Sequence, residues 1–317
     1  MIITVWRFSY QAIRAAGLAI LLLFELAGVR AQAGNITSAA AAYEYSDTRE
    51  MVLMVEDAAR LLEDKGEDAF DELSLPDSRW KHDSSYIYVY SVNGDCLFNS
   101  GQPELVGKNL RDYHDEDGRN VVRELMDIAS EPEENAAGWV FFLFQDGNVI
   151  SPVWKLSYNM KARLPDGRVV VVGSGRSSLK MERSFVTDRV EKAASLLQAQ
   201  GRDVAFKSIL DPASRFNFLG SYVFVLDQTG HTLVDPSFPN MPGRDLSGMT
   251  DAIGRSYIQE LLTKIAHSDT ASMMFFWRAN PNDVPQRKAI YARKVTVNGA
   301  DYIVGAEYLL PTPLWMK

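Results

Sequence analysis

The sequence has 317 residues, of which 23% are charged and 46% are apolar, and this composition excludes collagen-like and disordered chains. Thirty-three basic and 41 acidic residues give a net charge of −8, which argues against a nucleic-acid partner or an anionic membrane surface. The only cysteine, Cys96, excludes an intramolecular disulfide and a cysteine-rich zinc site.

The first 33 residues have the pattern of a secretory signal peptide. Basic residues precede an apolar run at 15–24, and Ala31-Gln32-Ala33 supplies the small residues that signal peptidase reads. Because this run is shorter than the roughly 20 residues of a bilayer span, a retained anchor is the weaker alternative. We expect cleavage near Ala33 and a periplasmic protein that does not span the membrane, since export without disulfides suits a bacterial periplasm.

An internal repeat organises the rest of the chain. Residues 55–62 match 190–197, residues 85–89 match 221–225, and 155–158 match 288–291, all at a nearly constant offset. The repeat predicts two copies of one domain. The predicted organisation is a signal peptide at 1–33, a linker at 34–47, domains at 48–180 and 181–310, and a short tail at 311–317.

Each copy contains the same predicted elements in the same chain order. In copy one they are a helix at 48–65, strands at 86–90 and 96–98, a helix at 118–129, and strands at 138–145, 153–162 and 168–174. In copy two they are a helix at 184–200, strands at 222–226 and 232–234, a helix at 253–266, and strands at 271–278, 287–296 and 301–308. Antiparallel strands grouped together, with helices outside the sheet, predict an α+β fold.

The order of these elements resembles the Cache family of extracytoplasmic sensor domains, in its single-Cache type and here present twice. In copy one the resemblance is carried by the segments Tyr88–Gly94, Gly107–Gly118, Lys155–Tyr158 and Val171–Gly175. It implies two tandem PAS-like domains, each with a curved antiparallel sheet and a long N-terminal helix. It also implies that the concave face of the sheet binds small ligands, often carboxylates or amino acids, without converting them.

Family members usually continue through the membrane into a receptor or kinase, whereas few residues follow the last predicted strand here. We therefore expect a soluble sensor that signals through a membrane receptor or histidine kinase on another chain. The alternative is an interaction or scaffold module that kept the fold and lost its ligand. Copy two departs from the family pattern at 247–251, which lacks the acidic turn of copy one.

Candidate binding residues follow from the chemistry of a small acid, which needs a cation and hydrogen-bond donors within an aromatic wall. The candidates in copy one are Arg111 and Lys155 as cations, with Tyr86, Tyr88, Tyr113, Trp139 and Tyr158 as wall and donors. Lys288 and Tyr291 are their counterparts in copy two. Each has an alternative role, because aromatic residues on strands often belong to the core, lysines can be solvated, and Arg111 can pair with Asp112.

No enzymatic motif accompanies these residues. The acidic cluster at 112–117 leaves a periplasmic hydrolase or a calcium site as a weaker alternative, but it lacks the later bidentate Glu of a calcium loop. The four histidines have no metal-binding spacing, and phosphate and dinucleotide loops are missing from the sequence. We expect a binding protein that is not an enzyme and has neither a cofactor nor a metal.

Overall fold

The computed structural model describes residues 38–76, 78–82, 85–145, 150–177 and 179–311. The predicted signal peptide, the first part of the predicted linker and most of the predicted tail lie outside these residues. Among the helices that are described, none combines the length and the apolar character needed to cross a bilayer.

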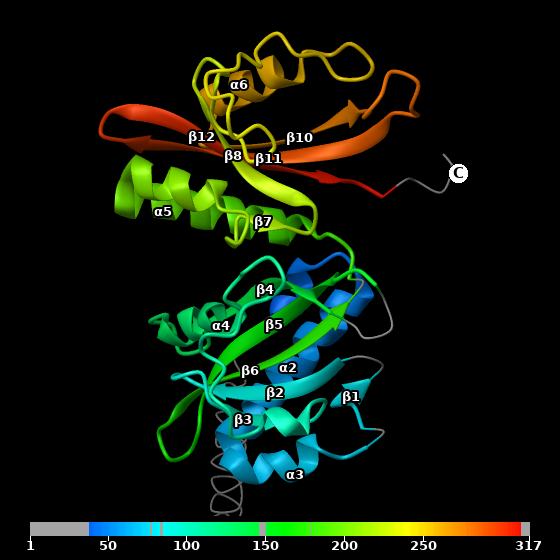
Figure 1. Ribbon diagram of the computed structural model, residues 1–317, viewed down its shortest axis with the longest axis vertical. Coiled ribbons are helices and arrows are strands. Elements are labelled where there is room, and N and C mark those ends of the chain that lie inside the picture. The colour runs from blue at the N-terminus through cyan, green and yellow to red at the C-terminus, as the bar shows by residue number, and fades with distance from the viewer. Residues whose placement is uncertain (1–37, 77, 83–84, 146–149, 178, 312–317) are drawn as a thin grey trace, which may run out of the picture. The chain divides into compact units, whose positions relative to one another are not determined.

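Sheet 1 is a six-stranded antiparallel sheet in the first half of the chain (Figure 1). Its strand order is β1-β2-β6-β5-β4, and β3 pairs with β2. The strands are β1 (Lys81–His82), β2 (Ser85–Ser91), β3 (Cys96–Asn99), β4 (Ala137–Phe144), β5 (Val153–Arg163) and β6 (Val169–Ser177). Chain order and spatial order differ, because β2 pairs with the last strand, β6, and this leaves β4 at one edge of the sheet.

Helices cover both faces of sheet 1. Helix α2 (Ser46–Lys65) lies against β5 and β6 on one face, and α4 (Val121–Ser130) contacts β4, β5 and β6 from the other (Figure 1). The predicted apolar stripe of α2, from Met51 to Leu62, is buried, as expected for an amphipathic helix on a sheet. The shorter helical segments are η1 (Ala39–Ala42), η2 (Gly66–Asp68), α3 (Ala69–Leu73) and η3 (Pro103–Leu105).

Sheet 2, in the second half of the chain, has the same arrangement of strands. Its order is β10-β11-β12-β8-β7, and β9 pairs with β8. The strands are β7 (Asn217–Phe218), β8 (Ser221–Asp227), β9 (Thr232–Val234), β10 (Thr270–Trp277), β11 (Gln286–Val297) and β12 (Ala300–Leu309). Helix α5 (Arg183–Leu210) packs on β11 and β12, and α6 (Tyr257–His267) packs on β10.

The predicted α+β fold with antiparallel sheets is confirmed, and the differences are local. Helix α5 continues to Leu210 instead of ending at 200, because a non-helical Gly201 (φ 80°, ψ 177°) is followed by a second helical stretch. Helix α6 begins at Tyr257 instead of 253, since the preceding residues form a turn closed by Asp251. The elements α3, β1 and β7 are too short for a periodic signal in the sequence.

Two glycines in the middle of strands leave the space that an aromatic ring of the neighbouring strand occupies. A Cβ at Gly305 of β12 would lie 2.7 Å from Cζ of Phe224, and a Cβ at Gly173 of β6 would lie 2.6 Å from the ring of Tyr88. These contacts are shorter than a van der Waals contact between carbon atoms, so a larger residue displaces the ring. The two glycines pair with equivalent strands, β8 and β2, in the two sheets.

We predict that Gly305→Ala lowers the free energy of unfolding by about 1–3 kcal/mol, because the added methyl group overpacks the ring of Phe224. Urea denaturation followed by tryptophan fluorescence measures the change. Gly248→Ala is the matched control, since a Cβ there would meet no atom within 4 Å. Equal stability of the two variants would contradict the packing argument.

Candidate ligand-binding site

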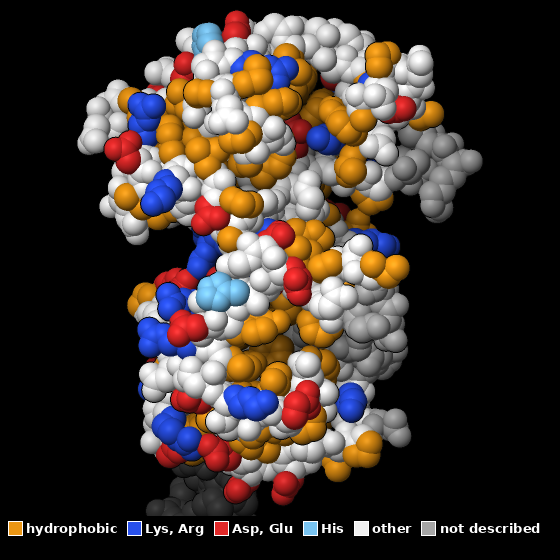
Figure 2. All heavy atoms as spheres, in the orientation of Figure 1, with side chains coloured by type: hydrophobic (Ala, Val, Ile, Leu, Met, Phe, Trp, Pro, Cys, Tyr) orange, Lys and Arg blue, Asp and Glu red, His pale blue; other side chains and the backbone are white. Residues whose placement is uncertain are grey.

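A cavity of about 180 Å³ lies between sheet 1, helix α4 and the segment that follows β3. Figure 2 shows hydrophobic side chains gathered over sheet 1, with charged side chains around them. The lining is mainly aromatic and aliphatic: Tyr86, Tyr88, Tyr90, Asn99, Gln102, Leu105, Leu110, Tyr113, Val121, Val122, Leu125, Phe142, Phe144 and Lys155. Such a wall with a few polar groups is typical of sites for small molecules.

Lys155 is the cation of this cavity. It lies on β5 between Phe142 of β4 and Ser177 of β6, and it is only 7% exposed. Its Nζ donates a hydrogen bond to Oη of Tyr86 (3.3 Å) and lies 4.6 Å from the ring centre of Phe144. An ammonium group at the wall of an aromatic cavity is suited to donate hydrogen bonds to a small anionic ligand.

Two tyrosines that line the cavity are held by polar side chains of neighbouring segments. Tyr88 donates a hydrogen bond to Oδ1 of Asn159 (2.6 Å), and Nδ2 of Asn159 donates to the carbonyl and to the hydroxyl oxygen of Ser157, both at 3.1 Å. The Tyr86 hydroxyl is 3.1 Å from Oε1 of Gln102, to which it donates. These bonds fix the tyrosine rings and thereby the shape of the cavity.

The tyrosines of the cavity are hydrogen-bond donors at neutral pH. Burial raises the pKa of Tyr86 and of Tyr88, and burial also raises the pKa of Tyr113 at the mouth of the cavity. Among the described residues, the lining of this cavity includes no carboxylate side chain. The site therefore combines one cation with neutral hydroxyl donors.

The structure brings four of the predicted site residues together: Tyr86, Tyr88, Tyr113 and Lys155. It places Trp139 and Tyr158 elsewhere, on the face of sheet 1 that packs against Tyr43 and Phe185. The cause is the two-residue period of a strand, which sends Lys155 and Tyr158, three positions apart, to opposite faces.

Arg111 is exposed and lies outside the lining of the cavity. Its backbone packs against the turn at Gly94, where an added Cβ would lie 2.9 Å from Cα of Arg111. The neighbouring carboxylate of Asp112 forms its salt bridge with Arg123 (2.5 Å), while Arg111 contributes only a weaker lowering of the Asp112 pKa. Arg111 thus does not line the cavity. It also does not form the salt bridge with Asp112 that was its alternative role.

The two candidate residues in the second half of the chain, Lys288 and Tyr291, also lie on opposite faces of their strand. Lys288 occupies the position on β11 that Lys155 occupies on β5, and it lines a cavity on sheet 2. Tyr291 points to the other face, where its hydroxyl donates to Oε1 of Glu191 on α5 (2.6 Å). The three-residue spacing again explains the separation.

Sequence reasoning missed Asn159, Ser157 and Gln102. A signal for the first two was present, because polar side chains alternate along β5 from Lys155 to Lys161, and alternation marks one polar face of a strand. Gln102 lies in a loop, and its position follows from the close packing of its neighbour Gly101 on Tyr86. A Cβ added at Gly101 would lie only 2.3 Å from the ring of Tyr86. No pattern in the sequence indicates that contact.

The acidic cluster at 112–117 has a structural role centred on Asp115. One oxygen of this buried carboxylate accepts hydrogen bonds from the backbone of Asp117 (3.0 Å) and Arg119 (2.8 Å), and the other accepts from the backbone of Leu143 on β4 (2.8 Å). Arg119 also forms a buried salt bridge with Asp115 (3.2 Å). We call this set of bonds the carboxylate clasp, and it ties the segment that lines the cavity to the edge of sheet 1.

Sheet 2 contains the same clasp. Asp251 accepts hydrogen bonds from the backbone of Ile253 and Arg255, and from the backbone of Phe276 on the edge strand β10 (3.2 Å). The segment 247–251 therefore lacks most of the acidic residues of 112–117, but it retains a carboxylate, Asp251, at the position of Asp115. Within the described parts of the chain, no three His, Cys, Asp or Glu side chains come together as a metal site.

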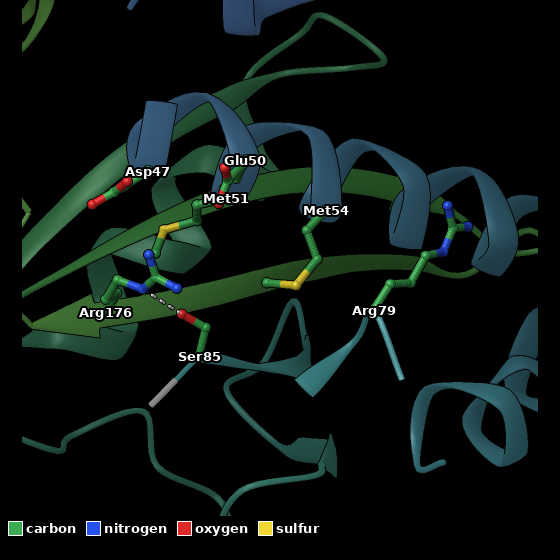
Figure 3. A pocket seen from close by; sticks show the side chains of 7 residues that line it. All are labelled: Asp47, Glu50, Met51, Met54, Arg79, Ser85 and Arg176. Atoms are coloured by element: carbon green, nitrogen blue, oxygen red, sulfur yellow. Dashed lines mark hydrogen bonds between the residues drawn. The ribbon is translucent and has the colours of Figure 1, made fainter. Parts of the chain in front are cut away.

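A second hollow, of about 210 Å³, lies between α2 and the start of β2 (Figure 3). Met51 and Met54 face it from α2, and Nε of Arg176 donates to Oγ of Ser85 (3.1 Å). Arg79, at its other end, forms a salt bridge with a carboxylate of α2 (2.8 Å). Because its side chains carry both signs of charge and its two arginines already have partners, this hollow is a weaker ligand site than the cavity of Lys155.

The comparison with protein families agrees with this fold. The family profile dCache_2, a Cache domain, matches residues 72–308. The chain therefore belongs to the Cache domain family, whose members are ligand-binding signalling modules. No curated protein sequence matches the chain.

Three solved structures illustrate the similarity. A periplasmic sensor domain of a chemotaxis protein is 22% identical over 43% of this chain and 100% of its own, with a TM-score of 0.34. A Cache chemosensory domain described in terms of carboxylic acid recognition is 18% identical over 40% and 92%, with a TM-score of 0.33. The ligand-binding domain of the Pseudomonas fluorescens chemoreceptor CtaA, in complex with L-alanine, is 11% identical over 90% and 97%, with a TM-score of 0.30.

We predict that Asp115→Asn lowers the free energy of unfolding by about 3 kcal/mol, because it breaks a buried ion pair and turns an amide group toward a backbone N–H donor. Asp112→Asn is the matched control in the same segment, since its salt bridge with Arg123 is exposed, and we expect little change. Thermal and urea unfolding measure both. Similar losses in the two variants would show that the clasp does not hold the segment.

Proposed function

We propose that this chain is a sensor whose sheet-1 cavity binds a small carboxylate without converting it. The observation that carries the proposal is the lining of the cavity, which places the buried cation of Lys155 beside the hydroxyl groups of several tyrosines in an aromatic wall. The carboxylate of the ligand accepts hydrogen bonds from Nζ of Lys155 and from the hydroxyl group of Tyr113, because the single O–H of Tyr86 donates to Gln102. The small volume of the cavity, about 180 Å³, favours short-chain acids.

The same proposal includes two tandem Cache domains, at 48–180 and 181–310. It is supported by the identical strand order of the two sheets and by the equivalent positions of Lys155 and Lys288. The repeated glycine contacts and the repeated carboxylate clasp also favour duplication of one unit, because unrelated folds have no reason to share them. A cavity on each sheet gives such a protein two places for a ligand.

We further propose an extracytoplasmic location and a signalling partner in the membrane. The location is supported by the family and by the signal-peptide pattern of the first 33 residues. A receptor or a histidine kinase is the class of partner that fits a ligand-binding signalling module. The scaffold alternative is less favoured, because a module that has lost its ligand is expected to fill its pocket with side chains, whereas the sheet-1 cavity has a volume of about 180 Å³.

The first test uses isothermal titration calorimetry of acetate, propionate and pyruvate against the exported chain. We predict saturable binding of at least one of the three, and a loss of about 2–5 kcal/mol of binding free energy in Lys155→Met, because the ligand charge is left without its partner. Lys288→Met, at the matched position of sheet 2, keeps the affinity. Unchanged affinity in Lys155→Met, or no binding of any of the three acids, would overturn the proposal.

The second test concerns location. Expression of the full chain in a Gram-negative host, followed by fractionation and intact-mass analysis, is expected to give a soluble periplasmic protein that begins near Gly34, because the apolar run is too short to anchor it. Ala31→Asp with Ala33→Asp removes the small residues at the cleavage site, and we expect the precursor to accumulate. A wild-type chain that retains residues 1–33 in the membrane fraction contradicts this prediction.

A further inference from the structure

An apolar hollow of about 330 Å³ lies where segments from the two halves of the chain meet. Among the described residues, its lining consists of six apolar side chains: Val153, Trp154, Leu156, Leu179, Met181 and Leu219. The first five come from the start of β5 and from the segment between β6 and α5, and the last comes from the turn that joins β7 to β8. Four of the six are only partly buried, so this apolar wall is open to solvent.

The lining of this hollow differs in kind from that of the other cavities. The cavities on sheet 1 and sheet 2 and the hollow between α2 and β2 all include charged side chains. The described lining here includes neither a charged group nor a hydroxyl or amide side chain. Such a wall has few groups with which to orient a polar molecule, and it gains most from contact with other apolar groups.

Leu219 reaches the hollow from a backbone conformation that is unusual for leucine. Its φ is 51°, in the left-handed region, and with Gly220 (φ 73°) it forms the two-residue turn between β7 and β8. Asn, Asp or Gly is favoured at the first position of such a turn, so a leucine there costs conformational free energy. A residue that is held against its backbone preference points to a role for its side chain, here as a wall of the hollow.

The last strand of sheet 2 ends beside this turn. Strand β12 is antiparallel to β8, and Ala306 lies opposite Val223. Continuing the same register for four residues brings Leu310 to the level of Leu219. The N–H of Leu310 still donates to the carbonyl of Arg287 (2.8 Å), so the strand keeps its direction up to this level. The chain therefore leaves sheet 2 next to the hollow.

The segment that follows is short and apolar. Residues 312–317 lie outside the described part of the chain and have the sequence Thr-Pro-Leu-Trp-Met-Lys. Leu314, the first of three consecutive apolar residues, comes three positions after Pro311, the last described residue. Three residues of extended chain span up to about 11 Å, so these side chains can reach a hollow that begins beside the end of the strand.

We propose that the C-terminal segment 312–317 docks in this hollow, with the side chains of Leu314 and Trp315 against Trp154 and Met181. Burial of these side chains removes apolar surface of both the segment and the wall from water. The docked segment contacts walls from both halves of the chain and holds the turn of sheet 2 against the start of β5. This docking does not depend on whether either cavity binds a ligand.

A segment of the same chain is a better occupant of this hollow than a second molecule. Its short connection to β12 gives it a local concentration in the millimolar range, so a small contact area suffices. The six lining residues are also far fewer than the roughly 20–30 residues that each partner contributes to a stable protein interface.

Photo-cross-linking of the full exported chain tests the docking directly. Trp315→p-benzoylphenylalanine is irradiated at low protein concentration, and mass spectrometry locates the cross-link. We expect cross-links within one chain, to residues 153–156, 179–181 or 219. Cross-links to other parts of the chain, or none at all, would overturn the inference. Cross-links between two chains, or to another protein of the host, would also overturn it, because they assign the hollow to a different occupant.

A double-mutant cycle measured by thermal unfolding gives a second test. We expect Trp315→Ala to lower the melting temperature by about 3 °C. Met181→Asp places a charge in the hollow, so Trp315→Ala has little further effect in that background. Met54→Asp, which faces the hollow of Figure 3, is the matched control, and Trp315→Ala keeps its full effect there.

The cycle contradicts the docking if the effects of Trp315→Ala and Met181→Asp add within about 1 °C, or if Trp315→Ala leaves the wild-type melting temperature unchanged. Far-UV circular dichroism establishes that each variant is folded. If Met181→Asp does not fold, Leu219→Asn replaces it, because asparagine suits the left-handed turn and removes the leucine side chain from the wall.

Discussion

The carboxylate clasp is the interaction on which both cavities depend. In each half of the chain one buried aspartate, Asp115 or Asp251, accepts backbone hydrogen bonds from its own turn and one more from an edge strand. Edge strands expose unpaired N–H groups, and a buried carboxylate satisfies one of them without adding a strand. The segment that closes each cavity is held at that point, so the cavity is bounded by a fixed wall.

The second constraint is the alternation of side chains along each strand. On β5 it sends Lys155, Ser157 and Asn159 to the face of sheet 1 that carries the cavity, and it sends Leu156 and Tyr158 to the face covered by α2. One strand thereby contributes both to the core and to the site, and a shift of one residue would exchange the two. The glycines of the neighbouring strands have a related role, because they leave the space in which the rings of Tyr88 and Phe224 lie.

Most of the fold could be predicted from the sequence, because the repeat and the hydrophobic periods are local patterns. The cavity could be predicted only in part. Tyr86, Tyr88, Tyr113 and Lys155 were found by chemistry and position, whereas Trp139, Tyr158 and Tyr291 were assigned without regard to the face they occupy. Arg111 illustrates another limit, since the direction of a loop side chain depends on tertiary packing that no local pattern contains. The salt bridge between Lys288 and Glu307 (3.1 Å) likewise depends on tertiary packing.

Cys96, the only cysteine of the chain, is fully buried on β3 beside Tyr90 and helix α4. Burial also raises the pKa of its thiol, so the reactive thiolate is scarce at neutral pH. A thiol reagent reaches this sulfur only when the cluster of Tyr90, Cys96 and Leu125 opens. The chain thus carries a natural chemical probe for the opening of the wall beside the sheet-1 cavity, and the rate of thiol labelling reports how strongly an occupied cavity keeps that wall closed.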